Sequence, residues 1–549
     1  MRTTKIHQLI ASMAALLLLA ASCVKDNGSY GNKAINVVTI SGIAATYQAE
    51  LGKNFSITPN LNYSLGEEHD DFKYEWHVMR ATSPQISLGV LSTEKDLNVT
   101  VEPNGLIGKA GSYTLMYCVT NLNTGIRYDY PFTVVVSDKM LTGCIVLHET
   151  ADNSFDVDMI ANFNDTLNHH ANLLALYQSA LPRQGRKALD IVCYKDAYSP
   201  SLSLIPSKDE YHYAVWILTD QSTDRVTADD YEYKPEFNIS NLQLGESSTL
   251  VAEKMFSTSY NTTKYQGNYV LSQGNLYFYT HFSNVDVFYG APVNTHQEDA
   301  TPYSIAPYIF MAPSAGAVVF NKDEHAFELH DASTAGMQAH AAVTTPLGNG
   351  WSDPNWEPVY IGNRTDGSSY YLIYGFAIVK DGVTNQYQFL QMSAMGGMSA
   401  TVNLLSQTAF PTGTDLSNMR FYAFHPTLPY LFFATEDKVY RVNVNAMNSV
   451  DDVTASVLLP GQKISLLKST AVRFPTTNNQ NKMLMVATYD PTGQAGQNAQ
   501  LAFYNVEDGT GDLTPAKYPA TPTADGFQQE MKWTGLGKVI GADYKQPTK

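Results

Sequence analysis

The sequence is poor in cysteine and in positive charge, and it has one long apolar run. Four cysteines in 549 residues exclude the disulfide framework that holds many small secreted domains together. Only 35 lysines and arginines face 52 acidic residues, for a formal net charge of -17. Nucleic acid is therefore not an expected partner, because binding a phosphate backbone needs clustered cations. Beyond the first thirty residues, no apolar run approaches the roughly 18 residues of a membrane-spanning helix.

The usual sequence signatures of catalysis are missing as well. There is no glycine-rich phosphate loop, His-Glu-x-x-His, nucleophile elbow, calcium-loop spacing or zinc-type Cys/His spacing. One short stretch is dense in titratable groups, and we weigh a metal site there against a solvated hairpin: Asp323, Glu324, His325, Glu328, His330 and Asp331, with His340 beyond. We expect the hairpin, and therefore no metal site. Because the catalytic and cofactor-binding motifs are also missing, we expect no catalytic residue and no cofactor.

The N-terminus has the order of a lipoprotein signal peptide. A basic start is followed by an apolar run from Ile10 to Ala21, which is too short to remain as a membrane helix. Small residues then precede Cys23, as acylation of that thiol requires. We predict a signal peptide over residues 1–22, lipidation of Cys23 and a polar tether over residues 23–34. An ordinary secreted protein, in which Cys23 is incidental, is the alternative.

Residues 35–138 are predicted to form one immunoglobulin-like β-sandwich. Six short, β-rich segments bounded by turn residues fall within about a hundred residues, as is typical of such domains. Trp76 lies in the third predicted strand, where these domains bury a tryptophan. The segment from Gly111 to Asn121 alternates, so every second side chain lies on the same face of the strand. We expect Tyr113, Leu115, Tyr117 and Val119 on the core face, and Cys118 on the opposite face. The second strand has no cysteine, so we expect no inter-sheet disulfide.

Residues 139–549 continue as strands and hairpins, which we interpret as a β-propeller. At roughly 45 to 60 residues per blade, this length accommodates seven or eight blades. The segment 538–542 near the end is expected to complete the first blade and close the ring. One helix is predicted over Thr166 to Ala180, from apolar residues at helical spacing. Two stacked β-sandwiches are the structural alternative.

The candidate ligand site is an aromatic loop within the predicted propeller. Trp351 and Trp356 lie in a polar Gly/Pro-containing stretch, and an exposed indole face is costly unless a sugar or peptide stacks on it. Tyr360, Tyr370 and Tyr371 would extend such a platform. The alternative is that both tryptophans fold back and fill a gap between blades.

Three stretches of the chain resemble the PKD-like family of Bacteroidetes lipoproteins. The start Cys23-Val24-Lys25-Asp26-Asn27-Gly28-Ser29-Tyr30 is similar to the family's Cys-Tyr-x-Asp-Lys-Gly-Asn-Tyr, from which Val24, Asn27 and Ser29 depart. Tyr74-Glu75-Trp76 with Gly111-Ser112-Tyr113-Thr114 resembles the paired strands of PKD domains. Gly143-Cys144-Ile145-Val146-Leu147 resembles a third family stretch, which usually has an aromatic residue in place of Cys144.

The resemblance implies a location and a role. Lys25-Asp26 resembles the short signal that carries such lipoproteins to the cell exterior, and Asp165-Thr166-Leu167 resembles an O-glycosylation site with Thr166 as acceptor. The family implies a surface-exposed outer-membrane lipoprotein, accessory to a starch-utilisation-type nutrient importer and its capture lipoprotein. Its ligand would be a glycan or peptide polymer, bound without catalysis.

The expected fold is thus all-β: an immunoglobulin-like (PKD-like) sandwich and then a β-propeller, with one short helix inserted. Two other roles stay open. Propellers also host glycan hydrolases and lyases whose carboxylates or histidines converge on the central channel. A purely structural subunit that braces the transporter is the third possibility.

Overall fold

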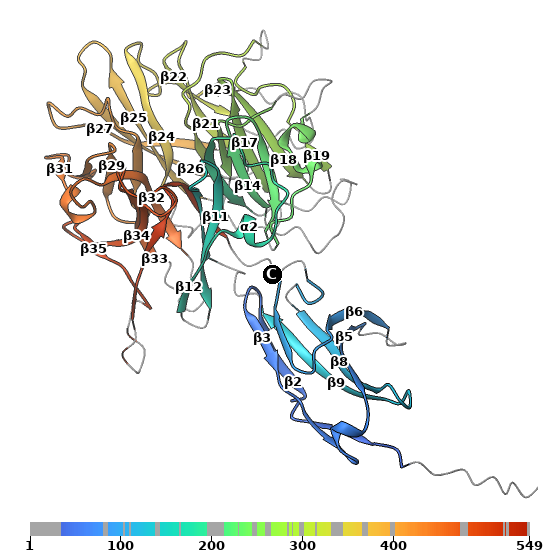
Figure 1. The fold of residues 1–549 in the computed structure, drawn as a ribbon. Coiled ribbons are helices and arrows are strands. Elements are labelled where there is room, and N and C mark those ends of the chain that lie inside the picture. The colour runs from blue at the N-terminus through green and yellow to red at the C-terminus, as the bar shows by residue number, and fades with distance from the viewer. Residues whose placement is uncertain are drawn as a thin grey trace, which may run out of the picture. The chain divides into compact units, whose positions relative to one another are not determined.

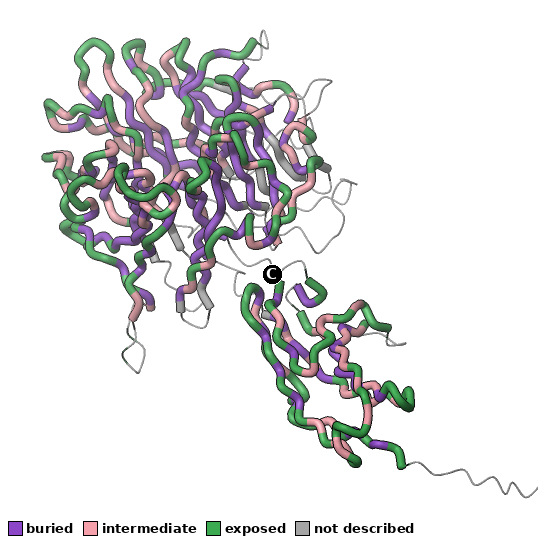
Figure 2. The backbone as a smooth tube through the Cα atoms, in the orientation of Figure 1, coloured by how far each residue is buried: buried purple, intermediate pink, exposed green. Residues whose placement is uncertain are grey.

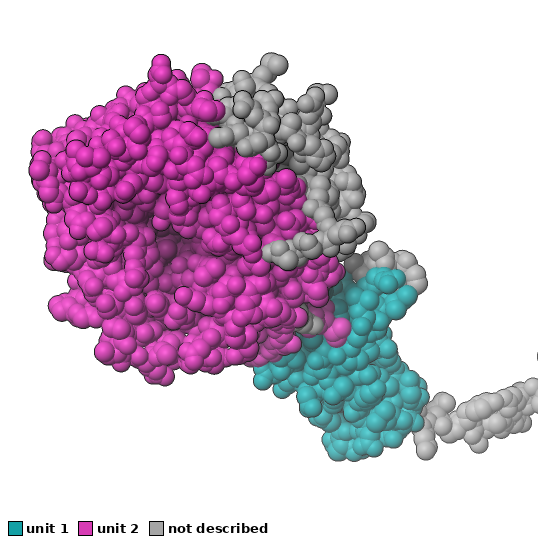
Figure 3. All heavy atoms as spheres, turned by 90° about the horizontal axis from the view of Figure 1, so that it is seen from above, with its two compact units in different colours: residues 1–47, 55–99, 113–134 teal, residues 48–54, 100–112, 135–549 magenta. Residues whose placement is uncertain are grey.

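A computed structural model describes most of the chain between residues 34 and 545. The described residues are 34–80, 86–102, 105–108, 111–137, 143–163, 166–194, 214–228, 230–243, 250–257, 265–282, 285–287, 289–295, 301–312, 316–330, 344–364, 372–395, 401–472, 481–519, 522, 526 and 528–545. They form two compact units (Figure 3): the described residues up to 47, within 55–99 and within 113–134 in unit 1, and those within 48–54, within 100–112 and from 135 onward in unit 2.

The N-terminal part is a β-sandwich, as expected. Its main sheet has the strand order β2-β9-β8-β5-β6, and two further strand pairs, β1-β4 and β3-β7, complete it (Figure 1). The strands are β1 (Val38–Ser41), β2 (Thr46–Glu50), β3 (Asn54–Ile57), β4 (Asn60–Tyr63), β5 (Phe72–Met79), β6 (Ser87–Ser92), β7 (Leu97–Thr100), β8 (Gly111–Asn121) and β9 (Arg127–Ser137). A 3-10 turn, η1 (Glu67–His69), precedes β5.

Trp76 is the centre of the sandwich core, which confirms its predicted burial. Its side chain is fully buried and stacks on Tyr117, with ring centroids 4.1 Å apart. Phe132 meets it edge-on, and the indole nitrogen donates to the Glu94 carbonyl at 2.9 Å. The indole thus combines aromatic contacts with a satisfied polar atom, which is how buried tryptophans are usually held.

The C-terminal part is a β-propeller in which the described residues form seven sheets (Figure 1). We number these blades 1 to 7 along the chain. Blade 1 contains β10 (Gly143–Glu149), β11 (Phe155–Phe163), β12 (Thr166–His170) and β39 (Val539–Lys545); blade 2 contains β13 (Ala188–Tyr194), β14 (Ala214–Thr219) and β15 (Thr223–Thr227); blade 3 contains β16 (Lys254–Ser257), β17 (Tyr265–Ser272), β18 (Asn275–Phe282) and β19 (Val285–Val287).

The remaining blades follow the same up-and-down order. Blade 4 contains β20 (Phe310–Ala312), β21 (Gly316–Asn321), β22 (Ala326–His330) and β23 (Thr344–Pro346); blade 5 contains β24 (Trp356–Arg364), β25 (Leu372–Asp381), β26 (Tyr387–Met395) and β27 (Thr401–Ala409); blade 6 contains β28 (Phe421–Phe424), β29 (Tyr430–Ala434), β30 (Val439–Asn443) and β31 (Asp451–Asp452); blade 7 contains β32 (Lys463–Val472), β33 (Asn481–Tyr489), β34 (Ala499–Val506) and β35 (Leu513–Pro515), with β38 (Lys532–Leu536) also paired to β34. The short pair β36 (Lys517–Tyr518) and β37 (Gln529–Glu530), and the 3-10 turns η2 (Pro235–Phe237), η3 (Ile239–Leu242) and η6 (Thr454–Ser456), lie between them.

The ring is closed by apolar cores between successive blades. Each of the seven buried clusters in this unit joins residues of two neighbouring blades, including one between blades 7 and 1. Central strands are covered on both faces, so strands such as β29 are buried throughout. Figure 2 shows this burial along the strands of the ring. The number of blades agrees with the lower of the two expected values.

The closing strand is confirmed. β39 pairs antiparallel with β10, with Val146 opposite Ala542 and Leu147 opposite Gly541. The end of the chain therefore completes the sheet that begins the propeller. Such a closure removes the open edge that an incomplete ring would expose.

The predicted helix is mostly wrong. Residues Thr166–His170 form strand β12, which pairs with β11, and only α2 (Leu173–Leu176) is helical. Asp156 of β11 accepts hydrogen bonds from the backbone nitrogens of Leu174 and Ala175, so it satisfies donors at the start of this single turn. The apolar residues at helical spacing are buried for two separate reasons. Leu167 is buried as part of strand β12, and Leu174 and Tyr177 are buried in and just after the single turn α2.

Two further findings concern the cysteines and membrane segments. The cysteines in the described part of the chain, Cys118, Cys144 and Cys193, are buried free thiols, so Cys144 and Cys193 do not pair. None of the described helices is long and apolar enough to cross a bilayer. Cys23 lies outside the described residues.

Candidate functional site

The predicted aromatic platform does not exist at the two tryptophans. The side chains of Trp351 and Trp356 are 6% and 2% exposed, and both belong to the core between blades 4 and 5. Phe327 of β22 contacts both rings edge-on, at centroid distances of 5.9 and 6.1 Å. The alternative of tryptophans filling a gap between blades is therefore correct, because the polar loop folds back over an apolar interface.

The three tyrosines of that platform have different outcomes. Tyr360 of β24 is half-buried and stacks on other tyrosines, as described below. Tyr370 and Tyr371 lie outside the described residues. Thr166, the candidate O-glycosylation acceptor, begins strand β12.

The acidic and histidine-rich stretch is not a solvated hairpin throughout. His330 is fully buried, its Nδ1 lies 2.5 Å from the Tyr269 hydroxyl, and burial lowers its pKa to about 3. Glu328 is also buried and accepts a hydrogen bond from the Asn321 amide at 2.7 Å. Asp331 and His340 lie outside the described residues. Across the part of the chain that the structure describes, no three metal-ligating side chains lie together.

A different group of side chains gathers at the axis of the propeller. The innermost strands of neighbouring blades contact one another: β39 contacts β13 and β32, β13 contacts β16, β24 contacts β20 and β28, and β28 contacts β32. Each of these strands, or the loop just before it, supplies one polar or aromatic side chain. We call these seven residues the axial ring. In the order of blades 1 to 7, they are Asp543, Asp190, Lys254, Tyr308, Tyr360, Tyr422 and Lys468.

One half of the axial ring is charged. The Lys468 Nζ donates to the Ala542 carbonyl at 2.8 Å and lies 3.6 Å from Oδ1 of Asp543. The other oxygen of Asp543 accepts a hydrogen bond from the Cys193 nitrogen at 2.7 Å. Burial raises the pKa of Asp190, although Lys468 partly opposes this shift. Burial also disfavours the charged form of Lys468, but attraction to Asp543 and Asp190 outweighs it and raises the pKa.

Lys254 joins the charged half to an aromatic half. Its Nζ lies 3.6 Å from the centroid of the Tyr308 ring, within the range of a cation–π interaction. Burial lowers the pKa of Lys254 to about 8, while the Asp190 carboxylate acts in the opposite direction. Tyr308, Tyr360 and Tyr422 then follow in a row, with successive ring centroids 4.6 Å apart.

The aromatic half keeps unused hydrogen-bonding groups. Burial raises the pKa of Tyr308, Tyr360 and Tyr422, so all three hydroxyls stay protonated near neutral pH. Among the described residues, these hydroxyls have no hydrogen-bond partner. Each can therefore donate to, and accept from, a ligand or water.

Solvent reaches the charged side chains although protein surrounds them. The side chains of Lys468 and Asp543 are 43% and 24% exposed, yet burial is the largest influence on the pKa of Lys468. These two side chains are therefore partly enclosed by protein and still accessible to solvent. The strand pairing is irregular directly before Asp190 and directly before Tyr360. Such β-bulges change the direction of the side chains that follow, and they are frequent beside functional sites.

The axial ring offers chemistry for binding a polar, uncharged ligand. Its two carboxylates and two ammonium groups cancel in charge, so neither a polyanion nor a metal cation is favoured by charge alone. Carboxylates, ammonium groups and phenols bind hydroxyl or amide groups from several directions. Two carboxylates in one enclosed space also meet a minimum requirement for acid–base chemistry.

Sequence reasoning missed the axial ring except for Tyr360. Its successive members are separated by about 45 to 75 residues along the chain, and no repeat marks them. The available signal is a lone charge inside an apolar strand, as in Leu189-Asp190-Ile191. Only the ring closure brings the charges of the axial ring together.

Comparison with known proteins finds similarity to a family in the N-terminal part. A family model of the PKD-like family matches residues 23–181. All three stretches that carry the resemblance described above lie within this range. The match spans less than a third of the chain and includes the sandwich and the beginning of blade 1. No curated protein matches the chain.

Several solved structures are similar over long parts of the chain. A quinonprotein alcohol dehydrogenase-like protein from Bacteroides thetaiotaomicron is 10% identical with a TM-score of 0.38, over 90% of this chain and 97% of that one. The WD40 domain of SCAP from fission yeast is 8% identical with a TM-score of 0.30, over 86% and 99%. A putative TolB from Agrobacterium tumefaciens is 10% identical with a TM-score of 0.26, over 57% and 88%. Similarity at this level says nothing about function.

Proposed function

We propose that this protein is a surface-exposed outer-membrane lipoprotein whose propeller binds an extracellular polymer, a glycan or a peptide, at the axial ring. The observation that carries the proposal is the ring itself: one side chain from each of the seven blades, with unpaired phenols beside a neutral set of charges. The lipid on Cys23 would confine the protein to the membrane surface, and the sandwich would act as a spacer.

The proposed role beside a nutrient importer follows from the membrane tether and the binding site together. A weak site on a tethered protein becomes effective on a repeating ligand, because neighbouring units of the polymer rebind at high effective concentration. Handing the polymer to a starch-utilisation-type importer and its capture lipoprotein needs no catalysis. The similarity of residues 23–181 to the PKD-like family supports this assignment.

The location and the partner are tested together. The tagged, lipidated protein is purified from detergent-solubilised outer membranes, beside a Cys23→Ser variant. We expect the importer barrel and its capture lipoprotein to co-purify with the wild type, and proteinase K added to intact cells to degrade it. The variant should leave the membrane fraction. Recovery of the protein alone, or protection from protease, would contradict the accessory role.

A glycan-active enzyme is the second candidate, and Asp190 favours it. Its burial raises its pKa, as a general acid requires, and Asp543 supplies a second carboxylate in the same ring. The discriminating variant is Asp190→Asn, which keeps the shape of the side chain. Release of reducing ends from a polymer by the wild type but not by the variant would establish the enzyme. Binding without product release by both proteins favours the non-catalytic role.

A further inference from the structure

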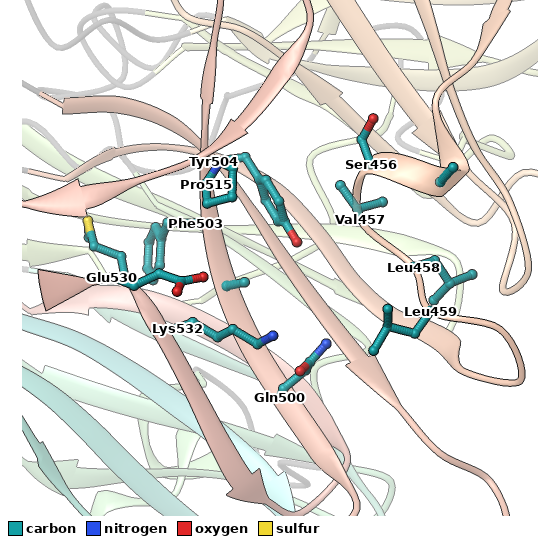
Figure 4. A pocket seen from close by; sticks show the side chains of 13 residues that line it. Ser456, Val457, Leu458, Leu459, Gln500, Phe503, Tyr504, Pro515, Glu530 and Lys532 are labelled. Carbon is teal, nitrogen blue, oxygen red and sulfur yellow. The ribbon is translucent and has the colours of Figure 1, made fainter.

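A second hollow lies on the rim of the propeller, away from the axial ring. It is formed by the turn η6 with the residues that follow, and by the outer strands β34 and β38 of blade 7 (Figure 4). Its volume is about 190 Å³, which is the scale of one sugar unit. The lining residues are Ala455, Ser456, Val457, Leu458, Leu459, Gln500, Ala502, Phe503, Tyr504, Pro515, Glu530, Met531 and Lys532.

Polar head groups converge on this hollow from one side. Figure 4 shows the Tyr504 hydroxyl, the Lys532 ammonium and the Gln500 amide directed toward a common space, with the Glu530 carboxylate beside them. Among the described residues, neither Glu530 nor Lys532 has an ion-pair partner, and the Tyr504 hydroxyl has no hydrogen bond. The Gln500 amide nitrogen is held by Thr488 at 3.0 Å, so its carbonyl oxygen remains available.

The opposite side of the hollow is apolar and continues into a second one. Leu459 is 59% exposed and lines this side together with Leu458, Val457 and Ala455. Ala455, Leu458 and Leu459 also line the neighbouring hollow, of about 750 Å³, with the charged groups of Asp437, Asp452 and Lys463. The two hollows thus form one elongated strip, which we call the rim groove, with an apolar ridge at its middle.

The chemistry of the rim groove selects among ligand classes. The carboxylates of Glu530, Asp437 and Asp452 outnumber the ammonium groups of Lys532 and Lys463, so no surplus positive charge favours a phosphate or polyuronate. Asp437 and Asp452 are already ion-paired with lysines, and no three metal-ligating side chains lie together in the described part of the chain, which disfavours a divalent cation. Side chains rather than a free strand edge supply the polar atoms, which disfavours an extended peptide pairing through its backbone. Mixed donors and acceptors facing an apolar ridge match the hydroxyl groups and the C–H face of a pyranose.

We infer that the rim groove binds a linear, neutral oligosaccharide as a second site for the polymer that the axial ring takes. This inference rests on the proposed function, and it predicts two sites per chain for a short oligosaccharide. A long polymer reaching both sites would gain avidity without any change in either site.

The test is calorimetric titration of the full mature chain with three named probes: maltoheptaose, cellohexaose and xylohexaose. We expect two molecules of at least one probe to bind per chain. The double variant Glu530→Gln with Lys532→Gln should lose one site or weaken it by about ten-fold, because it removes two charged hydrogen-bonding groups. Leu459→Ala should weaken the same site. Asp508→Asn with Lys517→Gln, which alters charges of blade 7 outside the groove, should keep both sites.

The outcomes separate this inference from the proposed function. A single site that the groove variants leave intact, but that Lys254→Met with Tyr308→Ala abolishes, would overturn the rim groove and leave the axial ring standing. If the groove variants lose binding and the ring variant binds as the wild type does, the rim groove would stand and the axial ring would be overturned as a binding site. Binding of hexagalacturonate or of a hexapeptide, but of none of the three neutral probes, would overturn the assignment of the groove to neutral sugars.

Discussion

Gly541 in the closing strand lies directly against the carboxylate of Asp190 in blade 2. A Cβ at residue 541 would stand 2.5 Å from Oδ1 of Asp190 and 3.1 Å from the backbone nitrogen of Ile191. The missing side chain therefore makes room for the buried carboxylate where the ring closes. One contact joins the closure of the fold to the candidate site.

Adding a methyl group at this contact should destabilise the propeller. We expect Gly541→Ala to cost about 1–3 kcal/mol of unfolding free energy, because the strand or the carboxylate must shift. Gly290→Ala is the matched control, since a Cβ there would meet nothing within 4 Å. Calorimetry of both variants measures the effect, and equal melting temperatures would show that Asp190 does not need this space.

The stability of blade 1 should depend on pH through His148. Both of its ring nitrogens face acceptors: Nε2 lies 2.8 Å from Oδ1 of Asp158, and Nδ1 lies 3.1 Å from the Glu149 carbonyl. Burial opposes the charged form, but the Asp158 carboxylate raises the pKa of His148 above 6.5. The stabilisation is thus complete below pH 6.5 and is lost as the pH rises through the folded-state pKa.

The partner Asp158 sets the acidic limit of the same stabilisation. Burial opposes its charge, but hydrogen bonds from His148 and His169 hold its pKa below 3.8, so its contribution is lost only at strongly acidic pH. His148→Gln should cost about 3 kcal/mol near pH 6 and flatten the fall in stability above pH 6.5. Chemical unfolding at several pH values measures this. His69→Gln, an exposed histidine of the sandwich, should leave the slope unchanged, and an unaltered slope for His148→Gln would refute the account.

The two buried tryptophans should affect stability rather than binding. Trp356→Ala should cost about 3–5 kcal/mol, because it leaves a cavity between blades 4 and 5. Tyr374→Ala, which truncates a side chain 38% exposed on the same sheet, should cost little. Chemical unfolding compares the two variants. A fully stable Trp356→Ala that binds polymer less tightly would restore the aromatic platform.

The buried thiols should be inert in the native protein. Burial raises the pKa of Cys118 and Cys144 to about 12 and raises that of Cys193 as well. The thiolate fraction at pH 8 is then on the order of one in ten thousand. We expect a thiol reagent to find no reactive group in the native, lipidated chain and three in denaturant. A fourth thiol, reacting at once in the native state, would show that Cys23 is not acylated.

The sequence predicted architecture better than it predicted local detail. Strand patterns and turn residues indicated a sandwich with Trp76 at its core, and a terminal strand that closes the ring. The helix over Thr166 to Ala180 failed because apolar residues at helical spacing also fit a strand followed by one turn, and pairing of β12 with β11 decided between them.

The candidate site was largely beyond sequence reasoning. Trp351 and Trp356 stand among polar residues, but that neighbourhood carries no information on whether the loop folds inward over Phe327. The axial ring depends on which strand is innermost in each blade, and no repeat marks these strands in the sequence. Asp190 shows only as a single charge within an apolar strand, and Lys468 and Asp543 lie in strands that each carry a second charged residue.

The central claim is that the axial ring binds an extracellular polymer, and native affinity electrophoresis tests it most directly. The full mature chain is run through gels containing starch, xyloglucan, α-mannan or gelatin, beside Lys254→Met with Tyr308→Ala and the control Tyr374→Ala. The account predicts that at least one polymer retards the wild type and the control, and that the ring variant loses most of this retardation while remaining folded. Equal retardation of the ring variant and the wild type, or no retardation of the wild type by any of the four polymers, would contradict it.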